Sequence, residues 1–294
     1  MKTIFILGIT LMILFSFKIE QRKIAKLPKE LKEISGLEIA SESTFYAIND
    51  GGNDPYIYEI DRKGKILRTI CVSNAKNLDW EDITIDENDR SKLYIGDFGN
   101  NKNSRKNLCI YSINLADMKS KNSTSRSNLQ VEAEKISFNY PDQAKFPPSK
   151  KNRRFDCEAM CLVGSNQLML FSKNNTKPYD GICYVYSLDL DDLKVELVAE
   201  IKMGKNGYFQ NSVTAADFYS TDANNAFFYL STYSSIYKFS FKDGKFIQKD
   251  KIDYKTFSQK ESLVVKDEYT IYVADETSPL GTGRNLYEIK HLND

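Results

Sequence analysis

The chain has 294 residues, of which 28% are charged, and its formal net charge is +1 at pH 7. This balance excludes recognition of a nucleic-acid polymer or a membrane surface through bulk charge. The aromatic content of 12% is typical of many half-buried strands. We therefore expect one large globular domain, present as a monomer.

An apolar run begins the sequence, from Ile4 to Phe17. It is shorter than the ~20 residues that a membrane-spanning helix needs, and it suits the apolar region of a secretory signal. No small-residue cleavage site follows it, so an uncleaved N-terminal anchor is the alternative. We predict that residues 1–20 are a signal peptide or anchor and that residues 21–294 form an extracytoplasmic domain, secreted or periplasmic.

Two motifs recur along the rest of the chain in the same order. The first opens on an acid or hydroxyl residue and continues with apolar residues two apart, beginning at Ser35, Glu81, Glu158, Thr214 and Glu261. The second places a tyrosine after an aliphatic residue, at Tyr58, Tyr111, Tyr186, Tyr237 and Tyr287. Two independent motifs that keep the same order five times indicate a repeat protein.

The first motif recurs at intervals of 46, 77, 56 and 47 residues. Most of these intervals are close to the roughly 40–50 residues of a four-stranded propeller blade. Alternation with period two excludes helical repeats. The sequence therefore predicts an all-β fold, a five-bladed β-propeller.

The predicted strands follow in chain order, four to a blade with the innermost first. They are 37–40, 44–49, 56–61 and 66–72, then 83–85, 93–96, 109–114 and 134–138, then 160–163, 167–172, 182–188 and 195–203, then 216–218, 226–231, 236–241 and 246–254, and finally 263–265, 269–274 and 286–289. Residues 119–128, rich in Ser, Lys and Asn, indicate a flexible insertion. The last blade lacks a fourth strand, and we predict that residues 23–27 supply it and close the ring.

Histidine and cysteine limit the chemistry. The single histidine, His291, lies in the C-terminal tail, so Ser-His-Asp and Cys-His catalysis are excluded on this chain. The five cysteines match no disulfide framework or zinc-binding spacing. We predict that they are buried, unreactive thiols.

The start of the first strand and the end of the second strand of a blade lie on the same face of a propeller. The residues that open the first motif should therefore surround one mouth of the central channel: Ser35, Glu81, Glu158, Thr214 and Glu261. Converging carboxylates repel one another unless a positive charge lies among them, and an all-oxygen ligand set suits calcium. The alternative is that these acids bind backbone N–H groups or water in the channel.

Basic residues are predicted around this centre. The loop 147–154 leads into the third blade, and Lys173 ends the next strand on the same face. Arg154 and Lys173 could hold a phosphate or carboxylate ligand. For Lys150 and Lys151, the alternative is a solvated charged loop.

The order of serine, glutamate, glutamate, hydroxyl and glutamate on successive inner strands resembles the calcium-activated nucleotidases (apyrases). The resemblance implies a five-bladed propeller whose central calcium supports hydrolysis of nucleoside di- and triphosphates, with Thr214 where that family has serine. The stretches 77–83 and 94–101 also resemble uncharacterised secreted bacterial propeller proteins. That second resemblance implies export and fold.

Two functions follow as hypotheses. The first is a binding module whose acidic face, with Tyr233, Phe209 and Trp80 nearby, holds a small anionic ligand, a sugar or a protein partner. The second is a metal-dependent hydrolase of phosphate esters or anhydrides, with Asp97 or Glu276 positioning water. Since propellers host both functions and no complete catalytic constellation is visible, we favour binding. The expected ligand-binding residues are Asp97, Arg154, Lys173, Tyr233 and Glu276.

Overall fold

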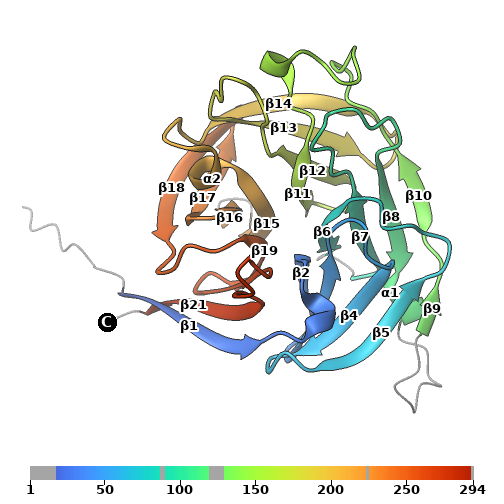
Figure 1. Ribbon diagram of the computed structural model, residues 1–294, viewed down its shortest axis with the longest axis vertical. Coiled ribbons are helices and arrows are strands. Elements are labelled where there is room, and N and C mark those ends of the chain that lie inside the picture. Colours follow the sequence, from blue (N-terminus) through green and yellow to red (C-terminus); the bar gives the residue numbers. More distant parts are fainter. Residues whose placement is uncertain (1–17, 87–89, 119–128, 223–224, 293–294) are drawn as a thin grey trace, which may run out of the picture.

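The computed structural model describes residues 18–86, 90–118, 129–222 and 225–292. Five sheets stand around a central channel like the blades of a propeller (Figure 1). The innermost strands pack against one another all the way round the ring. The predicted all-β, five-bladed fold is therefore confirmed. The predicted insertion at 119–128 and residues 1–17 of the predicted N-terminal segment lie outside the described residues.

The strands occur close to their predicted positions. Blade one contains β2 (Ile34–Ser41), β3 (Thr44–Asn49), β4 (Tyr56–Asp61), β5 (Ile66–Val72) and β9 (Leu129–Val131). Blade two contains β6 (Trp80–Ile85), β7 (Lys92–Asp97), β8 (Cys109–Asn114) and β10 (Glu134–Ser137). Blade three contains β11 (Cys157–Val163), β12 (Gln167–Ser172), β13 (Ile182–Asp189) and β14 (Val195–Lys202).

Blade four contains β15 (Val213–Asp222), β16 (Asn225–Thr232), β17 (Ser235–Lys242) and β18 (Lys245–Asp253). Blade five contains β19 (Lys260–Asp267), β20 (Thr270–Asp275), β21 (Asn285–Leu292) and β1 (Lys18–Lys26). The helices are single turns: η1 (Lys29–Leu31), α1 (Leu115–Met118), η2 (Lys150–Asn152) and α2 (Tyr208–Asn211). Within the described ranges, no helix has the length and apolar character needed to cross a bilayer.

The N-terminal strand closes the ring, as predicted. β1 runs antiparallel to β21, with Gln21 opposite Ile289, and so becomes the outer strand of blade five (Figure 1). Nη2 of Arg22 on β1 lies 3.1 Å from Oε2 of the buried Glu288, and Arg62 of blade one contacts the same carboxylate. β1 starts at Lys18, so it includes the last three residues of the segment predicted as 1–20.

Strand β9 was not predicted. It pairs in parallel with β5, with Ile70 opposite Leu129 and Val72 opposite Val131, and it makes blade one five-stranded. Only three residues long, β9 is too short to show the alternation by which the other strands were recognised.

The core is divided among the contacts between blades. Each of five apolar clusters fills the space between one pair of neighbouring blades, because the strands alternate and both faces of each sheet are covered. Trp80 lies fully buried in the cluster between blades one and two, with its ring 6.0 Å from that of Tyr111. The expectation that Trp80 belongs to the binding face is therefore wrong, because the alternation of β6 directs this side chain into the packed space between blades one and two.

Carboxylates join the inner strands of neighbouring blades. Oδ2 of Asp82 accepts a hydrogen bond from the Met160 N–H at 2.8 Å, and Oδ2 of Asp217 accepts one from the Val265 N–H at 2.7 Å. The inner strand of each blade is an edge strand, whose N–H groups need partners from outside the sheet. Asp82 and Asp217 accept hydrogen bonds from such N–H groups and thereby join the inner strands of neighbouring blades.

The cysteines form no disulfide. All five are free thiols, four of them buried and Cys71 half-buried. Burial raises the pKa of Cys109 to about 11, so this thiol stays protonated and unreactive.

Removing strand β1 should unfold blade five. A chain that begins at Leu27 leaves the edge of β21 unpaired and removes Arg22 from the Glu288 carboxylate, whereas a chain that begins at Lys18 keeps both contacts. We expect the shorter chain to melt at least about 10 °C lower or to aggregate, consistent with a loss of roughly 4 kcal/mol or more. Thermal unfolding of the two truncated proteins measures this, and equal melting temperatures would contradict it.

Candidate functional site

The predicted ring of residues is found at one mouth of the channel. Glu81, Glu158 and Glu261 lie at the starts of the inner strands β6, β11 and β19, and all three are buried. The two hydroxyls are bound to backbone: Ser35 donates to the Glu81 carbonyl at 2.7 Å, and Thr214 donates to the Lys260 carbonyl at 2.6 Å. The hydroxyls thus join neighbouring blades, while the glutamates carry the charge.

Lys173, expected on a basic rim, lies between the glutamates. Its Nζ is 3.0 Å from Oε2 of Glu158 and 3.9 Å from Oε1 of Glu261, and the side chain is buried. Burial alone would lower the pKa of Lys173, but the two glutamates raise it well above its usual value. The ammonium is therefore the positive charge that the converging acids require.

Tyr233 and Glu276 complete this part of the mouth. The Tyr233 hydroxyl donates to Oε1 of Glu261 at 2.5 Å, and Lys173 Nζ lies 5.4 Å from the centre of the Tyr233 ring. Gln259 donates to the Glu276 carboxylate. Burial and the charges of Glu261 and Asp50 raise the pKa of Glu276. Both residues lie where the sequence analysis expected them, at the ends of second strands.

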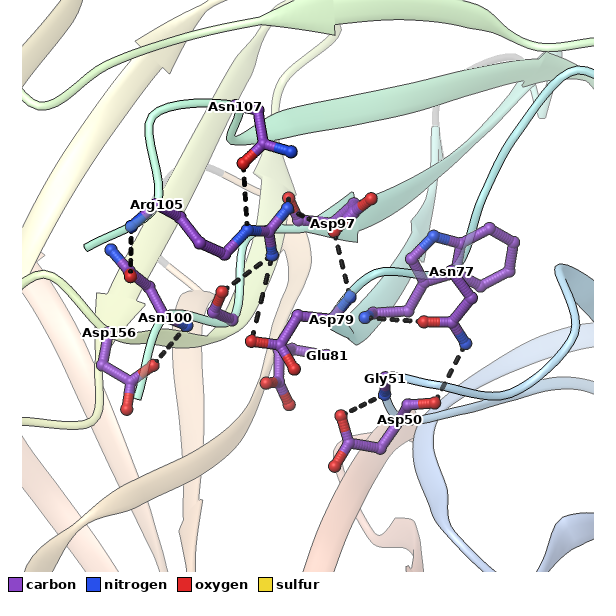
Figure 2. Close-up of polar contacts among 12 residues, drawn as sticks. Asp50, Gly51, Asn77, Asp79, Glu81, Asp97, Asn100, Arg105, Asn107 and Asp156 are labelled. Carbon is purple, nitrogen blue, oxygen red and sulfur yellow. Dashed lines mark hydrogen bonds and ion pairs between the residues drawn. The ribbon is translucent and has the colours of Figure 1, made fainter. Parts of the chain in front are cut away.

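A second group of carboxylates lies beside the ring, between blades one and two (Figure 2). Asp50, Asp79 and Glu81 each bring one oxygen within 4.8 Å of the others. Asp50 follows β3, and Asp79 lies two residues before Glu81. Burial raises the pKa of Asp50 to about 7 and, together with Glu158, raises that of Glu81. Such a group can share protons or hold a cation.

Small residues make this approach possible. A Cβ at Gly99 would lie 2.1 Å from Oε1 of Glu81 and 2.6 Å from Cγ of Asp79, and a Cβ at Gly51 would lie 2.6 Å from Oδ1 of Asp79. Asn77 holds the facing loop by donating to the Asn49 carbonyl at 2.9 Å. The loops can therefore pack closely enough for the carboxylates to meet.

Asp97 and Arg105 fix the second group (Figure 2). Nη2 of Arg105 lies 2.7 Å from Oδ1 of the buried Asp97, and Nη1 donates to the Gly99 carbonyl at 2.7 Å. The same oxygen of Asp97 accepts the Asp79 N–H at 3.1 Å. Asp97, expected to bind ligand, thus positions Asp79 and Arg105.

Arg154 does not join the ring. Its Nη2 lies 2.6 Å from Oδ2 of Asp142, and its guanidinium lies 4.6 Å from the centre of the Tyr184 ring. Although Arg154 precedes β11 at the correct end, it contacts Asp142 in the loop after β10 and Tyr184 on β13, the third strand of blade three. The guanidinium of Arg154 is therefore engaged by these contacts and does not form part of a basic rim at the channel.

Asp50 follows the second strand of blade one and so lies at an end that the strand direction places at the mouth. Three other charged residues of the mouth were not selected from the sequence: Asp79, Arg105 and Asp156. A signal was available for two of them, because Asp79 and Asp156 both stand two residues before a ring glutamate. Oδ1 of Asp156 accepts the Asn100 N–H at 2.6 Å. Among the residues that the structure describes, we assign eight carboxylates and two basic side chains to the mouth: Asp50, Asp79, Glu81, Asp97, Asp156, Glu158, Glu261 and Glu276 with Arg105 and Lys173.

Comparisons with known proteins add only the fold. No family model matches the chain, and no curated protein matches it significantly. Among solved structures, the major Malassezia sympodialis allergen Mala s 1 aligns with a TM-score of 0.57 at 11% identity, over 92% of this chain and 95% of that one. A protein from Lactobacillus plantarum aligns with a TM-score of 0.41 at 12% identity, over 87% of this chain and 71% of that one.

The WD40 β-propeller domain of Doa1 aligns with a TM-score of 0.42 at 13% identity, over 86% of this chain and 62% of that one. At these identities the similarity concerns the fold alone. The comparisons give no support to the resemblance to calcium-activated nucleotidases. What the site does must therefore be argued from its own residues.

Replacing Lys173 with methionine should destabilise the fold. The change leaves Glu158 and Glu261 buried without their cation, which typically costs about 3–5 kcal/mol. Adding Glu158→Gln to this variant should recover part of the loss, since one of the two charges is then gone. Urea unfolding of the single and double variants measures both effects, with the exposed Lys150→Met as the control. A Lys173→Met protein as stable as the parent would contradict the role of this ion pair.

The stability of the protein should fall as the pH rises, when divalent cations are removed by a chelator. The folded-state pKa of Asp50 is about 7, above its usual 3.8, so between these values the folded protein binds a proton that the unfolded chain releases. The free energy of unfolding is therefore highest at low pH, and it falls by roughly 2–4 kcal/mol as the pH rises to about 7 and Asp50 loses its proton. Urea unfolding from pH 5 to pH 9 tests this, and Asp50→Asn should flatten the profile. A rise in stability over this range would contradict it.

Proposed function

We propose that this protein is an exported binding module that uses the acidic mouth of its propeller to hold a calcium ion and, through it, a ligand or partner. The observation that carries the proposal is the second group of carboxylates, Asp50, Asp79 and Glu81, whose oxygens lie within 4.8 Å of one another. Three carboxylates at this separation match the oxygen ligands that calcium takes.

A buried oxygen beside this group supports the proposal. Oε1 of Glu158 has no hydrogen-bond donor among the described residues, although the residue is only 3% exposed. Its other oxygen binds Lys173, and its charge acts directly on Glu81. An ion held by Asp50, Asp79 and Glu81 would offset this charge. Calcium is favoured over magnesium because its coordination shell is larger and more flexible.

The position of Lys173 favours this place for the ion over the centre of the predicted ring. Its ammonium already lies against Glu158 and close to Glu261, so a second cation between those residues would be repelled. The hydroxyls of Ser35 and Thr214 donate to backbone carbonyls. In the second group, among the described residues, only Asp79 has a basic side chain in ion-pair contact, since Nη1 of Arg105 lies 3.9 Å from its Oδ2.

The alternative function, a metal-dependent hydrolase of phosphate esters or anhydrides, has one feature in its favour. Asp50 has a pKa of about 7 beside the carboxylate group, which suits a general base at neutral pH. Both basic side chains of the mouth are engaged, Lys173 by glutamates and Arg105 by Asp97, so a phosphate would meet excess negative charge. Phosphate release from ATP and ADP, with calcium and with chelator, tests this function.

Calcium should raise the melting temperature. A ligand at about 100 times its dissociation constant stabilises the folded state by about 2.7 kcal/mol, which corresponds to roughly 5–10 °C here. Asp79→Asn should remove this gain, and so should Gly99→Ala, whose methyl group displaces Glu81 and Asp79. The exposed Asp54→Asn, on a neighbouring loop, is the matched control. Thermal unfolding in chelator, calcium and magnesium provides the measurement.

Two outcomes would count against this proposal. Identical melting curves in all three solutions would show that the carboxylates hold no ion. If Glu261→Gln and Thr214→Val abolish the calcium effect while Asp79→Asn leaves it unchanged, the ion occupies the ring centre instead.

A further inference from the structure

Aromatic side chains form a ledge on one side of the acidic mouth. The ring centres of Phe209 and Tyr233 are 5.9 Å apart, and those of Tyr233 and Phe257 are 6.5 Å apart. Phe209 is 57% exposed and Phe257 is 66% exposed, whereas Tyr233 between them is buried. We call these three residues the aromatic ledge. Exposed apolar patches on a protein surface often mark interaction sites, and two large exposed rings beside a buried one form such a patch.

Local structure holds the ledge in place. Phe209 belongs to α2 just before β15, Phe257 precedes β19, and Tyr233 follows β16. The Ser234 hydroxyl donates to the Gln210 carbonyl at 3.0 Å, which ties the turn after β16 to the helix that carries Phe209. The ring of Tyr208 lies 5.4 Å from that of Phe209 and supports it from behind.

The ledge leads directly to the carboxylates. Tyr233 donates its hydroxyl to Glu261, and Gln259, two residues after Phe257, donates to Glu276. Burial raises the pKa of most of the eight carboxylates in the mouth, so they hold protons that an approaching cation can displace. The two basic side chains there are engaged, so the mouth favours a cation over an anion. A ligand for both surfaces needs an apolar body that contacts the rings and a positive charge that faces the carboxylates.

Arginine and lysine side chains have these two properties. Their aliphatic stems pack on apolar surface, and their charged groups are attracted both to aromatic faces and to carboxylates. The protein already contains one such contact, since Lys173 lies against the Tyr233 ring and Glu158. We propose that the aromatic ledge and the acidic mouth together bind the basic side chains of a peptide segment of a partner protein. This inference rests on the proposed function only in taking the mouth as the binding face; it does not require calcium.

A pair of peptides tests the proposal. The first alternates glycine and arginine and is blocked at both ends; the second carries citrulline, which has the shape of arginine without its charge. Isothermal titration of the full chain, in chelator and in calcium, should show binding of the arginine peptide that is at least about tenfold tighter than that of the citrulline peptide. Phe209→Ala with Phe257→Ala should weaken it at least about fivefold. Replacing both with tryptophan should keep it.

Controls separate the ledge from the calcium site. Ile247→Ala removes an exposed apolar side chain from β18 and should leave peptide binding unchanged. Phe209→Ala with Phe257→Ala should weaken peptide binding but leave the calcium effect on melting unchanged, so the two proposals can fail independently. Equal affinity for the arginine and citrulline peptides, absence of binding, or an alanine double variant that is folded and binds like the parent would each overturn the inference.

Discussion

Closure of the ring is the constraint on which the rest of this structure depends. Strand β1 comes from the N-terminal end of the described chain, yet it completes the blade built from the C-terminal strands (Figure 1). Without it, β21 would present an open edge, and the blade would lack its outer cover. The contacts of Arg22 and Arg62 with Glu288 place an ion pair at this seam. The pairing of the first and last strands of the described chain therefore closes the propeller.

The same closure creates the chemistry of the mouth. Five inner strands that start at one end of the channel bring side chains from their first residues together there. The second residues of β6, β11 and β19 are the glutamates Glu81, Glu158 and Glu261. Burial then raises the pKa of Glu158 and Glu81 because water no longer solvates their charge. Lys173 offsets part of the repulsion from the end of a neighbouring second strand. A site of this kind exists only in the closed ring.

The loops at this end of the channel divide the mouth between two kinds of surface. Near blades one and two they bring Asp50 and Asp79 to Glu81, with glycines that allow the close approach. Near blades four and five they bring exposed aromatic rings beside Glu261. A hard cation and the basic side chain of a peptide would use different sides of one acidic opening. This arrangement gives the two proposed interactions separate residues within a shared negative field.

The sequence by itself determined the fold, because the recurrence of two strand motifs at blade-like spacing and an unpaired last strand permit few other arrangements. It also placed Glu81, Glu158, Glu261, Lys173 and Tyr233 at the mouth, since the strand direction in a propeller fixes which residue ends share a face. Only the tertiary structure decided the partners of these groups. Side-chain direction turned Trp80 into the core and Arg154 toward Asp142, and loop packing brought Asp50 to Asp79 across two blades. The period-two alternation of a strand predicts which face of the sheet a residue occupies. Contacts between loops depend instead on turn conformations and on glycines that allow close approach, and these leave no periodic pattern in the sequence.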